Sequence, residues 1–454
     1  MKKTLLFMAM LCGISAVPAN AQEDPDSKYI RNSLYMLKLD MPADNEEYQH
    51  AFDVMNATFD NIDFAKRYER YNDFSLGIRH IEWNKIPTVT AEEMDAIEKE
   101  SKKDIALKEA LTKMGIKQDP ISEREYAARI LKYFNEEKFG NQLVAKWHIK
   151  SGESPKSVAA WDDQLSVIMD LGMKGLSEEA RENAKASENL VAMCGNSENK
   201  LLQTTYVCVN NYRMMTAEER SATAIALANV ALQYLPGPAK IAGQVAVKAA
   251  EVAAAKTKGY FVKTNAYLFK LDWSQEKFDE FYNVFWSNPA DFNSKADYKL
   301  TYVGKSSKSA GAGMTLNASK VDELTARGAL RATDAAFAAL QRDYEEFRPM
   351  CSLHVIDSKL CAYIGKKESV KEGDKFEVFQ PVENKDKSIE WKKIGTIKVA
   401  KNGVWDNSEG AGQTIEGEAQ DGEENNDTAT LSYTVFEGKP GKMGEGCMIR
   451  LAKK

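Results

Sequence analysis

The chain has 454 residues, 43% of them hydrophobic and 28% charged, with a formal net charge of −6 and a mean hydropathy of −0.47. This composition is that of a globular protein with a sizeable core, and it excludes a disulfide miniprotein, a collagen-like chain, a disordered chain and a polytopic membrane protein. The negative charge argues against nonspecific nucleic-acid binding, because such proteins need excess Lys and Arg to displace phosphate counterions.

Residues 1–21 have the pattern of a secretory signal peptide. Two lysines precede an apolar run over residues 5–17, and an Ala-x-Ala cleavage site ends at Ala21. The apolar run is about 13 residues long, whereas a helix that spans a bilayer needs roughly 20. We therefore expect cleavage after Ala21, export, and a periplasmic or outer-membrane-associated location.

Five cysteines follow the signal peptide. An oxidising compartment and short separations favour the disulfides Cys194–Cys208 and Cys351–Cys361, each between neighbouring strands, with Cys447 left over. The alternative is that some of these cysteines are simply buried thiols. None of them forms a C-x-x-C motif, which disfavours a thioredoxin-like or zinc site.

The N-terminal region mixes strand and helix patterns. An alternating segment at residues 29–40 predicts a strand, and a polar stretch with several aromatic residues follows. Capping boxes at Thr90 and Ser122 predict two helices, the first ending at Gly115 and the second near Gly140.

Short apolar runs dominate the next part of the chain. Residues 143–149 predict a strand, which precedes a helical region to Met169 and a helix from Ser177. The apolar runs at residues 190–193 and 201–209 flank a polar turn, a spacing typical of a hairpin.

Two alanine-rich segments follow. A capping box at Thr216 begins a helix that Pro236 ends, and a second helix is predicted over residues 239–257. Their small side chains predict a tight helical hairpin buried in the fold. A membrane hairpin is the alternative, which the charged residues of the second arm and the short apolar length of the first disfavour.

Strand and helix patterns alternate again after this hairpin. Residues 260–271 predict a strand, and Ser274 begins a helix whose aromatic stripe from Phe278 is typical of a core face. A strand at residues 298–303 leads into a Gly/Ser/Lys-rich segment, residues 304–313, which we expect to be a flexible linker.

A long helix is predicted over residues 319–347, and the sequence after it shows strand patterns without helices. Six short strands with Gly, Asp and Asn turns predict a small β-barrel of SH3-like or OB-like type. The expected fold class is therefore α+β, with a mixed helix and strand region before the barrel. The expected organisation is a signal peptide at 1–21, an α+β region at 22–350 that can divide into two subdomains near 150–215, and the barrel at 351–454.

No catalytic or metal-binding motif stands out in the sequence. The four histidines lack metal-ligand spacing, and H-E-x-x-H, G-x-S-x-G and dinucleotide fingerprints are missing. Seven acids and no basic residue lie in residues 409–427, which we expect to be a solvated connection between barrel strands, with a weak calcium site as the alternative. We name no catalytic residue, no metal and no cofactor.

Two resemblances extend this interpretation. The first rests on five segments: Ser33-Leu34-Tyr35, Val144-Ala145-Lys146-Trp147, Thr204-Thr205-Tyr206-Val207, Tyr267 to Trp273 and Val404-Trp405-Asp406-Asn407. With these segments, most of the chain resembles a group of uncharacterised secreted proteins of the Bacteroidota type, which implies no particular activity. The second rests on Thr333-Asp334-Ala335-Ala336, Glu372 to Val378 and Ile394 to Val399. There the C-terminal third resembles the helix and small barrel of flagellar-assembly and curli-secretion accessory proteins, which implies a role at the outer membrane.

These observations favour a binding or scaffolding protein of the cell envelope that is not an enzyme and contacts a protein partner. The candidate contacts on the barrel are Lys366, Lys367, Trp391 and Trp405. The alternative is a hydrolase that acts on envelope or glycan substrates through carboxylates that converge only in the fold. A third option is membrane association through residues 217–257. The oligomeric state is left open.

Overall fold

Two β-sheets and the helices around them make up the structure, a computed structural model. The predicted signal peptide, the helix from Ser177, the strand at 190–193 and Cys194 lie outside the described residues. The described residues are 31–43, 45–95, 97–99, 101–173, 198–316, 319–383, 389–413, 415–419 and 431–453.

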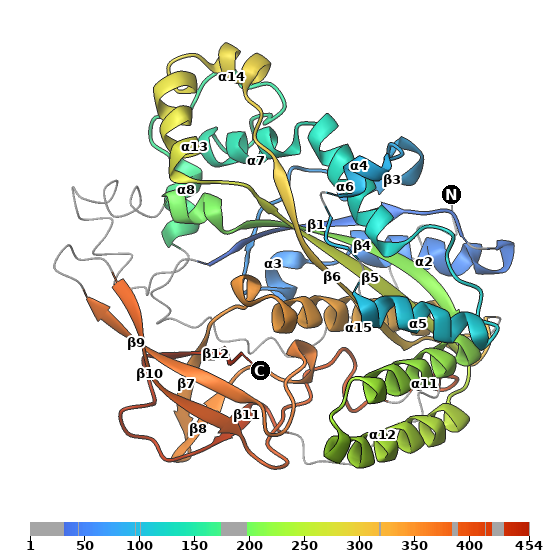
Figure 1. Ribbon diagram of the computed structural model, residues 1–454. Helices are drawn as coiled ribbons and strands as arrows, with labels where there is room; N and C mark the ends of the chain where they lie inside the picture. The colour runs from blue at the N-terminus through green and yellow to red at the C-terminus, as the bar shows by residue number, and fades with distance from the viewer. Residues whose placement is uncertain are drawn as a thin grey trace.

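The first sheet has six strands in the order β2-β1-β4-β5-β6, with β3 also paired to β1 (Figure 1). β1 is parallel to β2, β3 and β4, whereas β4, β5 and β6 are antiparallel. Parallel neighbours need a long crossover, and most helices of the N-terminal region lie in the segment between β1 and β4. The strands are β1 (Ser33–Asp40), β2 (Asn72–Asp73), β3 (His80–Glu82), β4 (Thr205–Thr216), β5 (Tyr260–Leu271) and β6 (Leu300–Gly311).

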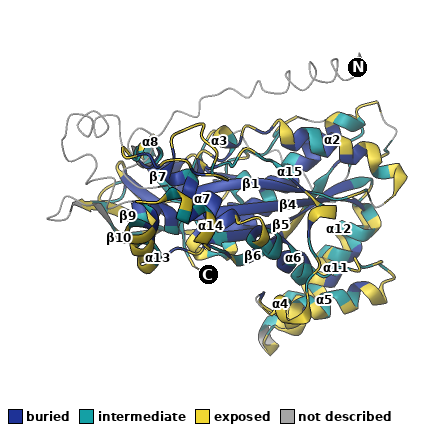
Figure 2. Cartoon of the chain, turned by 90° about the horizontal axis from the view of Figure 1, so that it is seen from above, coloured by how far each residue is buried: buried dark blue, intermediate teal, exposed yellow. Residues whose placement is uncertain are grey.

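Helices cover both faces of this sheet, so its strands are largely buried (Figure 2). Successive side chains of a strand point to opposite faces. Leu37 of β1 therefore joins the core beneath α6 and α7, while Met36 joins the core beneath α2 and α15. The helices are α2 (Gln49–Asp60), α3 (Phe64–Arg67), α4 (Ala91–Met94), α5 (Lys102–Lys113), α6 (Glu123–Glu136), α7 (Phe139–His148), α8 (Ser166–Met173), α11 (Ala217–Gln233), α12 (Gly237–Lys256), α13 (Gln275–Glu280), α14 (Pro289–Lys295) and α15 (Val321–Asp343), with short turns η1 (Glu46–Tyr48), η2 (Trp83–Lys85), η3 (Phe281–Phe285), η4 (Glu345–Phe347) and η5 (Lys366–Glu368).

The C-terminal strands close into a ring in the order β10-β11-β8-β7-β12-β9, and every neighbouring pair is antiparallel. One apolar core, which includes Leu353, Phe376 and Ile449, fills the ring. A mixed helix and strand fold with six C-terminal strands is therefore confirmed. The ring strands are β7 (Cys351–Ile356), β8 (Lys359–Ala362), β9 (Lys375–Glu383), β10 (Ile389–Val399), β11 (Thr434–Glu437) and β12 (Cys447–Leu451).

Two predicted strands are wrong in part or in full. Residues 143–149 belong almost entirely to α7, and residues 198–203 are helical before β4 begins at Thr205. The predictions rested on the short apolar runs at 143–149 and 201–209, and such runs fit a buried helix as well as a strand. Leu143 and Trp147 of α7 are fully buried, so this helix is enclosed in the core.

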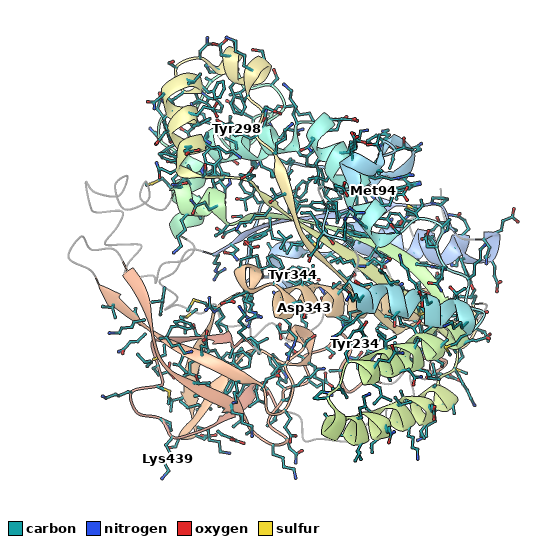
Figure 3. All side chains as sticks on the ribbon, viewed as in Figure 1. Met94, Tyr234, Tyr298, Asp343, Tyr344 and Lys439 are labelled. Atoms are coloured by element: carbon teal, nitrogen blue, oxygen red, sulfur yellow. The ribbon has the colours of Figure 1, made fainter. Side chains whose placement is uncertain are left out.

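The Gly/Ser/Lys-rich segment is part of strand β6, so the prediction of a flexible linker is wrong. β6 pairs with β5 from Leu300 to Gly311. Gly304 lies against the ring of Tyr344, which follows α15 (Figure 3), and a Cβ at Gly304 would lie 1.8 Å from Cζ of Tyr344. Packing requires this glycine, and composition alone does not reveal that requirement.

The predicted helix over residues 90–115 is two helices, α4 and α5. Thr90 caps the first, and a second capping box at Ser101 begins the other. The prediction that the aromatic stripe from Phe278 is core is confirmed, because Phe281 and Phe285 are buried.

The alanine-rich segments form the predicted helical hairpin. A Cβ on Gly243 of α12 would lie within 2.7 Å of methyl groups of Leu232 and Leu235, so the two helices pack closely. Much of α12 is nevertheless exposed, so the prediction of a buried hairpin is wrong for this arm. In the part of the chain that the structure describes, no helix is both long and apolar enough to cross a membrane.

The predicted Cys351–Cys361 disulfide is absent, and Cys361 is a free thiol. Cys361 lies opposite His354 on the neighbouring strand, three positions from Cys351. That offset is about 10 Å along a strand, beyond the Cα separation that a disulfide tolerates. Cys208, the predicted partner of Cys194, is also a free thiol, and burial raises its pKa to about 12.

Candidate binding site at the junction of helix α15 and the ring

Helix α15 has a polar side that faces the ring. Arg327, Arg331, Asp334 and Arg342 lie on one side of the helix, because their spacings are close to whole turns. The other side contributes alanines and leucines to the core beneath the sheet. The ring lies beside α15 (Figure 1), and charged side chains of the helix make the contact.

Asp334 is the centre of this junction. Arg67 at the end of α3 donates to both carboxylate oxygens, from Nε at 2.9 Å and from Nη2 at 2.5 Å. The hydroxyl of Tyr68 donates to the same carboxylate at 2.9 Å. Asp63 caps the N-terminus of α3 and so fixes the turn that brings Arg67 and Tyr68 to Asp334.

Burial and charge act together on these groups. Burial alone would lower the pKa of Arg67, but the adjacent carboxylate of Asp334 more than offsets it, so the pKa of Arg67 is raised. The pKa of Tyr68 is raised well above its ordinary value by burial and by the same carboxylate. The cluster therefore holds a guanidinium and a neutral phenol.

A loop of the ring region joins the same network. Arg67 pairs with Glu409 at 3.0 Å, and Arg331 pairs with Glu418 at 2.7 Å. Arg327 donates to the carbonyl oxygen of Gln413 at 2.7 Å. The expectation of a solvated acidic connection is therefore wrong for Glu409 and Glu418, because arginines of α3 and α15 bind them.

The strands of the ring are also tied to the end of α15. Arg342 donates to both oxygens of Asp374, at 2.7 Å and 2.9 Å, and to the carbonyl oxygen of Ser369 at 2.6 Å. Burial would lower the pKa of Arg342, but the hydrogen bonds to Asp374 have the larger effect and raise it. These contacts fix the orientation of the ring against the helix.

Two adjoining pockets lie along this junction. The first holds about 310 Å³ of space, part of it open to solvent, and Tyr68, Tyr71 and Phe337 form its aromatic side. Arg67 and Lys367 supply positive charge at its edge. The second, of about 450 Å³, lies between the end of α15 and the ring and shares residues with the first.

The turn η5 closes the first pocket from the ring side. Lys367 reaches across, and its ammonium donates to the carbonyl oxygen of Arg67 at 2.6 Å. Glu368 accepts hydrogen bonds from the amide of Gly365 at 2.7 Å and from the side chain of Asn407 at 2.8 Å. A Cβ at Gly365 would lie 2.3 Å from the carbonyl oxygen of Trp405, so only glycine allows this approach.

Three of the four predicted contact residues come together here. Lys366 lies beside Lys367 in η5 and pairs with Asp406 at 2.8 Å. The amide of Lys366 also donates to the carbonyl oxygen of Trp405 at 2.9 Å. Trp405 is half-buried, and Lys366 is about half exposed. We call Lys366, Lys367 and Trp405 the η5 surface.

Trp391 lies elsewhere on the ring. It is half-buried in β10, opposite Pro381 of β9, near the outer end of that hairpin. The other end of β10, at Val399, leads to the loop that carries Trp405. The offset of eight positions from Trp391 to Val399 corresponds to about 26 Å of strand. Trp391 therefore does not share the η5 surface.

The polar side of α15 was missed in the sequence interpretation. The spacing of Arg327, Arg331 and Asp334 could have indicated this polar side, because apolar residues occupy only the other side of the helix. The partner of Asp334 was not available, because Arg67 lies 267 residues away in the chain.

A second polar cluster lies between the end of β1 and the start of β3. His80 bonds to Asp40 at 2.8 Å through Nδ1 and to Asp60 at 2.5 Å through Nε2. The buried ammonium of Lys38 donates to Asp40 at 2.6 Å. Among the described residues, no group of three or more His, Cys, Asp or Glu side chains is arranged to hold a metal ion.

No protein-family model and no curated protein matches the chain.

Proposed function

We propose that the protein is an exported binding or scaffolding protein of the cell envelope that works without catalysis and contacts a protein partner through the η5 surface. The observation that supports this most directly is the junction itself. Two lysines lie on η5, and a backbone hydrogen bond from Lys366 holds Trp405 beside them. Lys367 bonds η5 to α3, and Ser369, just after the turn, accepts from Arg342 of α15.

A contact surface held in one conformation loses little entropy when it binds, which favours affinity. Tryptophan is also enriched among the residues that dominate binding energy at protein interfaces. Lys366 and Trp405 keep part of their side chains exposed, so a partner can reach both.

The alternative, a hydrolase, receives less support from the same pockets. Acid and base catalysis on glycans needs two carboxyl groups that can reach the substrate. Asp334 is bound by Arg67 and Tyr68, and Glu368 accepts from Gly365 and Asn407. Asp334 therefore ties α15 to α3, and Glu368 is bound by groups of the ring region, so both carboxylates are engaged in structural contacts.

The signal peptide at 1–21, the periplasmic or outer-membrane location and the kinship with secreted proteins of the Bacteroidota type belong to the same proposal. So does the assignment of the ring to the small β-barrels of SH3-like or OB-like type. Six short antiparallel strands around one apolar core support that assignment.

An affinity capture from detergent-solubilised envelopes, with identification of the retained proteins by mass spectrometry, tests the proposal. We expect one reproducible partner that the double variant Lys366→Glu/Trp405→Ala no longer retains. Trp391→Ala is the matched control, because it removes a half-buried tryptophan of the same ring outside the η5 surface. Circular dichroism melts check that each variant is folded.

Two outcomes contradict the proposal. The first is a chain that retains no protein reproducibly. The second is a partner that binds the Lys366→Glu/Trp405→Ala variant as well as it binds the unchanged chain.

A further inference from the structure

Helix α12 carries an apolar stripe on its outer side. Ile241, Val245 and Val252 are 71%, 65% and 59% exposed, and Ala249 between them is also exposed. Their spacing of four, four and three residues places them in one line along the helix. We call Ile241, Val245, Ala249 and Val252 the outer stripe.

The outer stripe is not needed to attach α12 to the protein. The opposite side of the helix, with Gly243, Val247, Ala250 and Ala254, is half-buried and faces α11. Figure 1 places the hairpin of α11 and α12 at the edge of the molecule, with α12 outermost. The helix therefore presents a second apolar side that the described residues leave uncovered, and such surfaces mark interaction sites.

Basic residues accompany this apolar stripe. α12 contains Lys240, Lys248 and Lys256 but only one acid, Glu251, so its charge is positive although the whole chain carries −6. Lys248 lies beside the outer stripe, and Lys256 continues its line one turn beyond Val252. An exposed apolar line accompanied by lysines fits a helix that lies in the interface of an anionic bilayer.

A second copy of the chain is a poorer occupant. Lys248 lies near the middle of the outer stripe, between Ile241 and Val252. A twofold axis that pairs two outer stripes antiparallel would bring Lys248 close to the same residue of the other copy. Like charges in a closely packed interface disfavour that arrangement.

We propose that the outer stripe of α12 docks on an anionic lipid surface, with the helix parallel to the membrane plane and Lys248 and Lys256 at the level of the headgroups. This inference goes beyond the proposed function, since it needs no protein partner. The η5 surface and the outer stripe belong to different elements, so one molecule could use both.

Flotation of the exported chain with phospholipid vesicles in a density gradient tests the inference. The anionic probe is vesicles of phosphatidylcholine with one third phosphatidylglycerol, and phosphatidylcholine alone is the neutral probe. We expect the chain to float with anionic vesicles at low salt and to remain at the bottom with neutral vesicles or at high salt, because the lysine contribution is electrostatic.

The variant Val245→Glu is expected to abolish flotation, since it places a carboxylate in the outer stripe. Lys248→Gln is expected to lower the partition coefficient about fivefold, the equivalent of one lysine near an anionic surface. Val284→Glu is the matched control, because Val284 is 49% exposed and lies in η3, outside the hairpin. It is expected to float like the unchanged chain.

Three results would overturn the inference. The unchanged chain could remain at the bottom with anionic vesicles at low salt, or Val245→Glu could float as well as the unchanged chain. A dimer measured by light scattering that Val245→Glu dissociates, without any vesicle binding, would instead assign the outer stripe to a second copy. A failure of the envelope capture leaves these vesicle results unaffected.

Discussion

At the residue scale, His80 shows how two strands and a helix converge on one titratable group. Its imidazole lies between the carboxylates of Asp40 and Asp60. The hydrogen bond to Asp40 raises the pKa of His80 above its ordinary value, although burial opposes the shift. Burial would raise the pKa of Asp40, but hydrogen bonds from His80 and Lys38 more than offset it and lower that pKa.

These shifts predict a pH-dependent contribution to stability. The pKa of His80 is raised in the folded state, so its protonation stabilises the fold. This contribution to the unfolding free energy is complete below the unfolded pKa, about 6.5, and is lost as pH rises through the folded pKa. We therefore expect the difference in unfolding free energy between the unchanged chain and His80→Asn to shrink from about pH 5 to about pH 9. Urea unfolding at several pH values measures it.

The ring proton of His80 offers an independent measurement. Its NMR titration midpoint is expected above the ordinary histidine value, and it should move down in Asp40→Asn. A midpoint at or below the ordinary value would contradict the charge arrangement around His80.

At the element scale, α7 depends on a close approach to the chain before β6. A Cβ at Gly140 would lie 2.1 Å from the carbonyl oxygen of Tyr298, which is a backbone atom. Asn141 holds the same contact, because its side chain accepts from the amide of Tyr298 at 2.7 Å and donates to the carbonyl oxygen of Ala296 at 2.6 Å. The helix and this segment therefore pack backbone to backbone.

Gly140→Ala is accordingly expected to destabilise the protein by about 3 kcal/mol, since the clash with backbone cannot be relieved by a side-chain rotation. Gly237→Ala in the first turn of α12 is the control, because nothing lies near its added methyl group. It should change the stability by less than about 1 kcal/mol. Urea unfolding compares the two, and equal effects would contradict the packing described for α7.

Local signals predicted some elements well. Thr216 and Ser122 cap helices as expected, and β5 occupies the predicted residues, because caps and alternation are properties of neighbouring residues. α7 and the second part of β6, residues 304–311, were missed, since their assignment depends on contacts with distant segments. Gly304, for example, faces Tyr344, which lies 40 positions further along.

The candidate site was predictable to a smaller extent. Lys366, Lys367 and Trp405 could be proposed from their residue types, and the bridge between Gly365 and Trp405 brings them together. The pair of Arg67 and Asp334 could not be proposed, because nothing in the local sequence around either residue indicates that the two meet in the fold.

At the scale of the whole molecule, Asp334 links α3, α15 and the loop of the ring region through Arg67 and Glu409. The carboxylate of Asp334 is only 5% exposed. Removing its charge would leave the buried guanidinium of Arg67 with Glu409 alone. A buried ion pair that loses one partner is strongly destabilised.

Asp334→Asn is therefore expected to lower the unfolding free energy by about 3–5 kcal/mol and to increase hydrogen exchange in the loop around Glu409. Asp322→Asn is the control on the same helix, since Asp322 is 40% exposed and pairs with the exposed His50. Its expected effect is below about 1 kcal/mol. Equal stability of the two variants would show that the junction is not held by this charge.

The position of β1 has a consequence for the order of folding. β1 lies inside the first sheet, yet Ser33 pairs with Thr205, and β4 in turn requires β5. Pairings between distant residues form slowly, because the chain loses the conformational entropy of a long segment before the contact is made. A newly made chain must therefore remain without a complete sheet until more than half of its length is available, a delay that would serve a chain exported unfolded through a translocation pore, as we propose for this one.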